Sequence, residues 1–255
     1  MAALLAPRST KHLLDAMSAD FVGFTIVSAV RRGDLQGVRN WLHGGGDPNF
    51  VVKPESGFTV LMFATFSSAR ANGVLDVVRL LLAHGSDPNY ATTAAEDGEY
   101  EAGRSALYFA AVDRNVPAVD LLVAFGAHVD AATLRRGWTP LAAVCATRPP
   151  RQLLWSDDDD DAPLDAAVAD RLLSAGASCV RDMSGSYPIH HAIRRAHYDL
   201  VKSLVVNEVD VDVLDADDAT PLALVAKDDV RTLKLLRAAG ASDHVAPPPP
   251  RPRRW

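Results

Sequence analysis

Residues 104–130 read RSALYFAAVDRNVPAVDLLVAFGAHVD, and the spacing within this stretch decides the fold. Counted from Leu107, the small residue Ala110 follows three positions on, Val119 twelve on and Gly126 nineteen on. Apolar residues three and four apart give each of two short helices one apolar stripe. A glycine directly after the second helix favours a helix end in which that residue has positive φ. The stretch therefore predicts one helix-turn-helix unit.

The same offsets recur along the chain, which makes the unit a repeat. Counting from Ile26 gives Ala29, Gly33, Val38 and Gly45, and counting from Ile189 gives Ala192, Val201, Leu204, Asp210 and Asp212. The offsets also recur from Leu61 with five residues inserted, from Leu141 with about sixteen inserted, and from Leu222 with one deleted. No single unit can bury both of its faces, so we predict that the stack of units is the fold.

Two Gly-rich segments, WLHGGGDPNF (41–50) and LLAHGSDPNY (81–90), raise the alternative of a phosphate-binding loop. Such a loop leads from a strand into a helix, whereas each of these segments leaves a predicted helix. Their glycine, aspartate and asparagine fall at shared offsets, which are Gly45, Asp47 and Asn49 in one and Gly85, Asp87 and Asn89 in the other. We interpret them as the turns at which repeats end. The offsets leave Gly44 and Gly46 unexplained.

Several motifs resemble the ankyrin repeat, which begins TPLHxAAxxG and ends LLLxxGADxN. They are GWTPLAA (137–143), YPIHHA (187–192), ATPLAL (219–224) and the two DPN endings. The resemblance covers about residues 24–244 as six repeats in one domain. It implies an all-α ankyrin-repeat solenoid of about six helix-turn-helix repeats joined by finger-like β-turn loops. It also implies a structural role for His190, at the consensus histidine.

Local signals agree with this architecture at the helix starts and at the chain ends. Thr139 and Thr220 are suited to cap first helices, with Pro140 and Pro221 at the first helical position. We expect residues 1–23 to form an N-terminal capping helix and leader. Residues 245–255 are expected to form a disordered Pro/Arg-rich tail.

Two insertions depart from the repeat length. The stretch between Asn89 and Leu107 adds four acidic residues to one finger, either as an acidic contact loop or as a solvated insertion. The larger insertion, at about 148–164, contains SDDDDD at 156–161, whose like charges favour disorder. Calcium-binding loops place ligands at alternate positions with a glycine at the sharp turn. This run has neither feature, so we predict no metal site there.

The tail contains a PxxPxR pattern formed by Pro249, Pro252 and Arg254. Some aromatic-lined adaptor domains read this pattern in a polyproline II helix, and a plain disordered terminus is the alternative. Because the tail is basic and the run at 157–161 is acidic, a further hypothesis is that the tail folds back on the insertion until a partner releases it.

Composition excludes several classes of function. Lys and Arg number 26 against 32 Asp and Glu, and the resulting charge of −6 argues against a general nucleic-acid binder. Only two cysteines occur, which favours a reducing compartment, cytoplasmic or nuclear, over a disulfide framework. No apolar run approaches the length of a membrane span. No metal-ligand spacing or catalytic set is present, so we predict no catalytic residue, no cofactor and no enzyme.

The resemblance places partners on the concave face made by the fingers and first helices. Exposed positions there are predicted to be Phe58, Arg104, Arg135, Arg136, Trp138, Arg194 and Arg195. Trp and Arg are enriched in interface hot spots, and Arg pairs with carboxylate or phosphate groups. We predict a non-catalytic scaffold or adaptor, monomeric on its own, that binds an acidic or phosphorylated protein segment. The alternatives are a regulatory subunit of an enzyme or of a nucleic-acid-associated complex, or a scattered surface without shared function.

Overall fold

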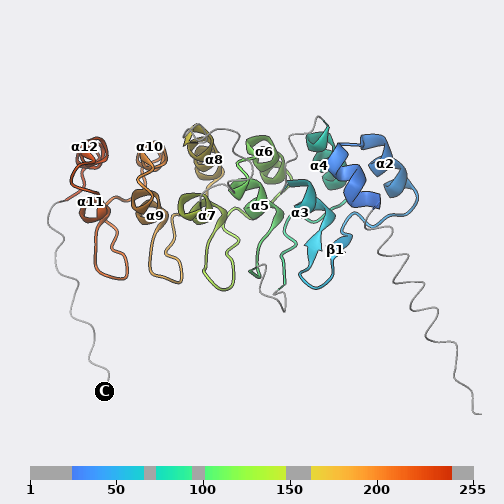
Figure 1. The fold of residues 1–255 in the computed structure, drawn as a ribbon, viewed down its shortest axis with the longest axis horizontal. Helices are drawn as coiled ribbons and strands as arrows, with labels where there is room; N and C mark the ends of the chain where they lie inside the picture. The colour runs from blue at the N-terminus through green and yellow to red at the C-terminus, as the bar shows by residue number, and fades with distance from the viewer. Residues whose placement is uncertain (1–24, 66–72, 94–100, 148–161, 243–255) are drawn as a thin grey trace, which may run out of the picture. The chain divides into compact units, whose positions relative to one another are not determined.

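The computed structural model describes residues 25–65, 73–93, 101–147 and 162–242 (Figure 1). They form successive helix pairs, and within each of the two units named next the loops between pairs extend to one side as fingers. The chain divides between Ala131 and Ala132 into two compact units, unit 1 and unit 2. Strands in these residues are confined to one short hairpin and one isolated bridge, so the predicted all-α class is confirmed. No helix in the described part of the chain has both the length and the apolar character needed to cross a bilayer.

Unit 1 begins with helical residues 25–32 and continues through α2 (Leu35–His43), α3 (Val60–Thr65), α4 (Val74–Ala83), α5 (Ala106–Val112) and α6 (Val116–Ala124). The finger between α2 and α3 contains an antiparallel hairpin of β1 (Val51–Lys53) and β2 (Phe58–Thr59). First helices pack on first helices, as α3 does on α5, and second helices pack on second helices, as α4 does on α2 and α6. Unit 1 is therefore a two-layer stack.

Unit 2 has the same two layers. One contains α7 (Pro140–Ala146), α9 (Pro188–Arg194) and α11 (Pro221–Leu224). The other contains α8 (Ala162–Ser174), α10 (Tyr198–Val206) and α12 (Val230–Ala238). The fingers of unit 2 lead into the first of these layers. The first helices therefore set the position of each finger.

The repeated positions supply the core and the helix starts. Leu107, Leu141 and Ile189 are fully buried, and the small residues Ala110 and Ala192 between helices are buried as well. Small side chains there let adjacent helices approach closely, and the leucines fill the space between the layers. The predicted caps are confirmed, since Thr139 Oγ1 accepts from Ala142 N and Thr220 Oγ1 accepts from Ala223 N, each at 3.2 Å.

The DPN endings close one repeat and attach it to the next. Asp47 Oδ1 accepts from the backbone N–H of Asn49 at 2.8 Å, which forms the turn. Asn49 then accepts from Asp87 N at 2.7 Å and donates to Gly85 O at 3.3 Å, both in the following repeat. Asn89 makes the same two bonds, to His128 N at 2.7 Å and to Gly126 O at 3.1 Å. Their interpretation as repeat ends is confirmed.

Glycine after the second helix has the expected backbone. The terminal glycines all have positive φ, and they are Gly45, Gly85, Gly126, Gly176 and Gly240. Glu208 takes this place after α10, with φ of 58°. Gly46, unexplained by the offsets, lies under Trp41, where an added Cβ would come within 2.4 Å of ring atom Cε2. Gly44 is the C-cap of α2, with φ of −75°, which any residue can adopt.

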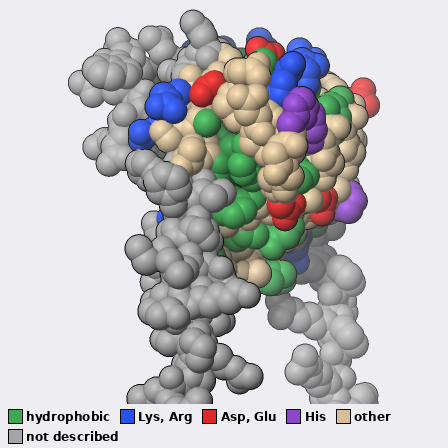
Figure 2. All heavy atoms as spheres, turned by 90° about the vertical axis from the view of Figure 1, so that its right-hand side faces the viewer, with side chains coloured by type: hydrophobic (Ala, Val, Ile, Leu, Met, Phe, Trp, Pro, Cys, Tyr) green, Lys and Arg blue, Asp and Glu red, His purple; other side chains and the backbone are tan. Residues whose placement is uncertain are grey.

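The end of unit 1 that holds α2 exposes apolar side chains at its centre (Figure 2). A cavity on this end is lined by Ile26, Ala29, Gly37 and Trp41, with Thr25, Arg32 and Asp34 around them. The capping helix predicted within 1–23 lies outside the described residues. So do the acidic residues at 96–99, the aspartate run at 157–161 and the tail with Pro249, Pro252 and Arg254. Helix α8 begins at Ala162, within the last residues of the predicted insertion.

Candidate partner-binding surface

The seven residues predicted to contact a partner are divided between the two units. Phe58 belongs to unit 1 and is 4% exposed, so its predicted exposure is wrong. The reason is the β1–β2 hairpin, which turns the Phe58 ring inward to pack edge-on against Phe109, with centroids 5.0 Å apart. Burying an aromatic ring against another contributes more to stability than leaving it in water.

Arg104 also belongs to unit 1 and has contacts with its neighbours. Its guanidinium carbon lies 5.2 Å from the centroid of the Tyr108 ring, and one of its nitrogens lies 3.8 Å from the Glu101 carboxylate. The side chain is mostly covered, at 20% exposure. Arg104 therefore supports the lengthened finger next to α5 and is a weaker candidate for a partner contact.

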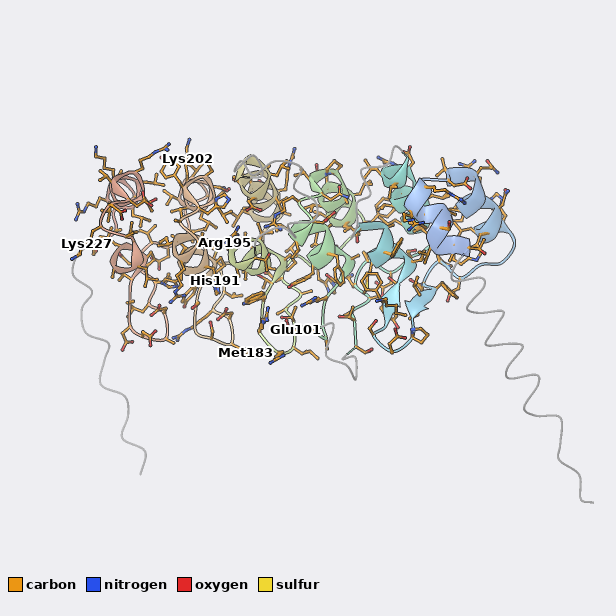
Figure 3. The ribbon with its side chains drawn as sticks, in the orientation of Figure 1. Glu101, Met183, His191, Arg195, Lys202 and Lys227 are labelled. Atoms are coloured by element: carbon orange, nitrogen blue, oxygen red, sulfur yellow. The ribbon has the colours of Figure 1, made fainter. Side chains whose placement is uncertain are left out.

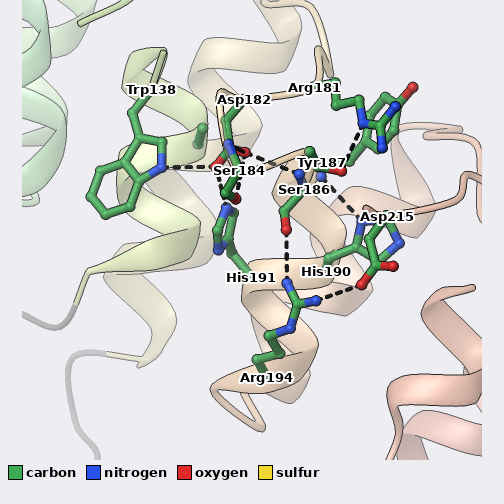
Figure 4. Close-up of polar contacts among 12 residues, drawn as sticks. Trp138, Arg181, Asp182, Ser184, Ser186, Tyr187, His190, His191, Arg194 and Asp215 are labelled. Carbon is green, nitrogen blue, oxygen red and sulfur yellow. Dashed lines mark hydrogen bonds and ion pairs between the residues drawn. The ribbon is translucent and has the colours of Figure 1, made fainter. Parts of the chain in front are cut away.

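Unit 2 joins two neighbouring fingers through Trp138. The Trp138 finger (residues 133–138) and the Asp182 finger (residues 182–187) meet where Met183 N donates to Arg136 O at 2.9 Å. Trp138 Nε1 donates to Asp182 Oδ2 at 2.9 Å, and His191 Nε2 lies 2.8 Å from the same oxygen (Figure 4). The Trp138 and His191 rings meet edge to face with centroids 5.9 Å apart. These contacts fix the Trp138 ring in one orientation.

The other oxygen of Asp182 holds its own finger closed. Asp182 Oδ1 accepts from Ser184 N at 2.8 Å, from Ser184 Oγ at 2.7 Å and from Ser186 N at 2.9 Å. Burial alone would raise the pKa of Asp182. The hydrogen bonds from Ser184, Ser186, His191 and Trp138 together outweigh burial and lower that pKa below its usual value. The carboxylate is therefore ionised at neutral pH.

The Asp215 finger (residues 215–220) repeats this arrangement beside Arg194. Asp215 Oδ1 accepts from Asp217 N and Ala219 N, each at 2.9 Å, and Oδ2 pairs with the Arg194 guanidinium. Arg194 also donates to Ser186 Oγ at 2.9 Å, so it bridges two fingers. Its side chain is 40% exposed, which leaves one edge accessible from solvent.

His190 has the structural role that the resemblance implied. It is fully buried, its Nδ1 accepts from Tyr187 N at 3.1 Å, and its Nε2 donates to Val213 O at 3.2 Å. Burial lowers the pKa of His190, and the charge of Asp215 and the bond to Val213 oppose that effect only in part. The neutral imidazole joins one finger to the next.

Arg195 was predicted to be exposed, and this prediction is wrong. Its side chain is 14% exposed, and its Nη1 donates to Val144 O at 2.9 Å and to Cys145 O at 3.3 Å. These carbonyls are in the last turn of α7. The guanidinium also lies 3.5 Å from the Asp165 carboxylate of α8, which His197 approaches at 3.0 Å. Carbonyls at a helix end need donors, and Arg195 supplies them where the long insertion interrupts the helix pair.

Arg135 and Arg136 are exposed on the Trp138 finger, as predicted. The guanidinium carbon of Arg136 lies 4.5 Å from the centroid of the half-buried Trp138 ring, at the distance of a cation–π contact. Arg194 is linked to Trp138 through Ser186 and Asp182, in the same unit. We name Arg135, Arg136, Trp138 and Arg194 the Trp138 surface.

Two exposed apolar residues beside this surface were missed from the sequence. Leu134 is 72% exposed and Met183 is 74% exposed. Each stands directly after the residue that closes its finger, Thr133 or Asp182. Leu134 lies six residues before Pro140 and Met183 five before Pro188, so the repeat register alone would not have paired them.

Models of the ankyrin-repeat family match most of the described chain. A model of three ankyrin repeats matches residues 26–130 and 66–151, and a model of a single repeat matches residues 184–216. The chain belongs to the ankyrin-repeat family. The predicted all-α ankyrin solenoid is confirmed by these matches together with the helix pairs. Ankyrin repeats are generally modules of protein–protein interaction. Within the described residues, no group of three His, Cys, Asp or Glu side chains is placed to hold a metal ion.

Proposed function

We propose that this ankyrin-repeat protein is a non-catalytic scaffold or adaptor that binds an acidic or phosphorylated protein segment on the Trp138 surface. A protein partner follows from the family. The observation that supports this surface is a tryptophan held by Asp182 and His191 and covered by an exposed arginine. We place it, as a monomer, in the cytoplasm or nucleus, where Cys145 and Cys179, which form no disulfide, stay reduced.

Two physical arguments favour this surface. Ordering an aromatic side chain on binding costs entropy, and Trp138 is already ordered by its bond to Asp182. Tryptophan and arginine are both among the residue types enriched in interface hot spots. Arg135 and Arg136 are also exposed cations next to each other, which suits carboxylate or phosphate groups on a partner.

The test compares two double variants in pull-downs from the native cell extract. Arg135→Ala with Arg136→Ala should weaken retention of the partner about tenfold, equivalent to about 1.4 kcal/mol. Lys202→Ala with Lys234→Ala is the matched control, because both lysines are exposed on the second helix layer, away from the fingers (Figure 3 labels Lys202). Unfolding midpoints should be unchanged in both.

Equal losses in both double variants would show a general effect of charge and would refute the Trp138 surface. The same pull-down also separates the alternatives. Co-purification of an enzyme would indicate a regulatory subunit, and co-purification of nucleic acid with a steep salt dependence would indicate a nucleic-acid-associated complex.

A further inference from the structure

Two neighbouring fingers of unit 2 each carry an exposed apolar residue, at positions that differ by one residue in the repeat register. Leu134 follows Thr133 in the Trp138 finger, and Met183 follows Asp182 in the Asp182 finger, where Figure 3 shows it at the tip. Both side chains are more than two-thirds exposed. The backbone bond from Met183 N to Arg136 O holds the two fingers together, and the Met183 side chain lies beside Gly137 of the finger that carries Leu134.

The charge beside these apolar residues changes sign along unit 2. Arg135 and Arg136 are exposed in the first of these fingers, and Arg181 is exposed directly before the second. The Asp215 finger carries exposed acidic residues instead, Asp217 and Asp218. A chain lying across the three fingers therefore meets cations at one end and anions at the other.

We infer that the segment bound here is dipolar, with two apolar residues between an acidic end and a basic end, and that it binds in one orientation. The inference rests on the proposed function and adds the direction in which the partner lies. Apolar side chains of the partner that pack on Leu134 and Met183 contribute binding free energy, because apolar surface on both sides is buried. The reversed orientation places like charges together, which costs affinity and fixes direction.

The spacing of the apolar residues in the partner follows from the stack. Neighbouring helices pack about 8–10 Å apart, so the two fingers that carry Leu134 and Met183 are separated by about the same distance. In an α-helix, residues seven apart are separated by about 10.5 Å on one face. In a polyproline II helix, residues three apart are separated by about 9 Å on one face. Either spacing places one apolar residue on each finger.

Carboxylates fit the basic end better than a phosphate does. Arg136 is held over the Trp138 ring, and Arg181 Nε donates to Gly185 O at 2.8 Å. These bonds fix the two guanidinium groups on different partners instead of converging on one point. Several Asp or Glu side chains can pair with separated arginines, whereas one phosphate needs donors that converge.

The experiment selects peptides from a phage-displayed library of random 16-residue peptides, with the full 255-residue chain as the target. The selected peptides should share two apolar residues, three or seven apart, with acidic residues on one side and basic residues on the other. A labelled synthetic peptide of that consensus is then titrated by fluorescence anisotropy. Reversing the positions of its acidic and basic ends should weaken binding at least tenfold.

Variants of the full chain assign the peptide to the surface. Leu134→Ser with Met183→Ser should weaken binding at least tenfold, and folding should be unaffected because both residues are exposed. Val206→Ser with Val230→Ser is the matched control, since these valines are exposed on α10 and α12 in the other layer. Asp217→Lys with Asp218→Lys should weaken binding of the dipolar peptide and strengthen binding of a peptide that is acidic at both ends.

The outcomes separate this inference from the proposed function. If Arg135→Ala with Arg136→Ala weakens the selected peptides and Leu134→Ser with Met183→Ser does not, the inference is overturned and the proposed function stands. Selected peptides that are acidic throughout, or that bind equally after their ends are exchanged, overturn the single orientation. A selection that yields no peptide dependent on either double variant counts against both.

Discussion

Replacing Asp182 with alanine should destabilise unit 2 because this carboxylate receives five donors. Three of them close its own finger, and two come from Trp138 and His191. Ser184 is exposed and His191 is half-buried, so after the substitution both can hydrogen-bond to water instead. Ser186 N is buried, and Trp138 Nε1 faces the space that the carboxylate vacates.

The expected magnitude comes from the two donors that cannot recover a partner. A buried donor left without an acceptor costs about 1–3 kcal/mol, so we expect Asp182→Ala to lower the free energy of unfolding by about 3 kcal/mol. Urea unfolding followed by far-UV circular dichroism measures this loss. Asp217→Ala is the control, because that side chain is exposed in the next finger and its loss should cost less than about 0.5 kcal/mol.

A loss below about 1 kcal/mol for Asp182→Ala would refute the reasoning, because the donors would then have found other partners. A second arm uses pH. The hydrogen bonds lower the pKa of Asp182, so its stabilising contribution is present above the usual carboxyl pKa and is lost as pH falls through the folded value. The difference in stability between the wild type and Asp182→Asn should therefore be full at pH 7 and shrink below about pH 4.

Three further predictions concern single residues. Glu208→Gly should raise the free energy of unfolding by up to about 1 kcal/mol in urea unfolding, because Glu208 has φ of 58° where the other repeats use glycine; a loss of stability would contradict this. Gly46→Ala should lower the thermal midpoint, since its Cβ would clash with the Trp41 ring, and Gly45→Ala, strained in backbone but open in space, separates the two causes. Because burial lowers the pKa of His190, stability should fall as pH drops below about 6.5, where the unfolded imidazole takes up a proton. That slope, from urea titrations at several pH values, should be smaller in His190→Gln, and an unchanged slope would contradict the assignment.

The architecture could be predicted from the sequence because the same spacing of apolar, glycine and capping residues recurs in several repeats. Glycine after a helix and threonine before a proline each report on backbone within a few residues, and both features occur where the offsets placed them. The buried consensus histidine, His190, follows from the same register. Local signals of this kind depend little on tertiary contacts.

Exposure of individual side chains was harder to predict, because it depends on contacts distant in sequence. Arg195 is covered because it lies beside Asp165 of α8 and donates to the last carbonyls of α7. Phe58 is covered because its finger contains a hairpin, which the repeat consensus does not specify. Asp182 accepts the hydrogen bond from the Trp138 indole, although it lies 44 residues away.

The exit of one repeat behaves differently from the others. Asn49 and Asn89 each accept a hydrogen bond from a backbone N–H of the repeat that follows, and Asp212 likewise accepts from Ser242 N at 2.9 Å. The equivalent residue after α8 is Val180, whose side chain is 43% exposed and has no polar atom. The repeats on either side of Val180 are still joined at their fingers, through Trp138 and Asp182. Their second helices are joined as well, because Asp170 of α8 accepts from Ser203 of α10 and from Asn207 at its C-cap, so these two repeats hold together without a polar bond from the exit.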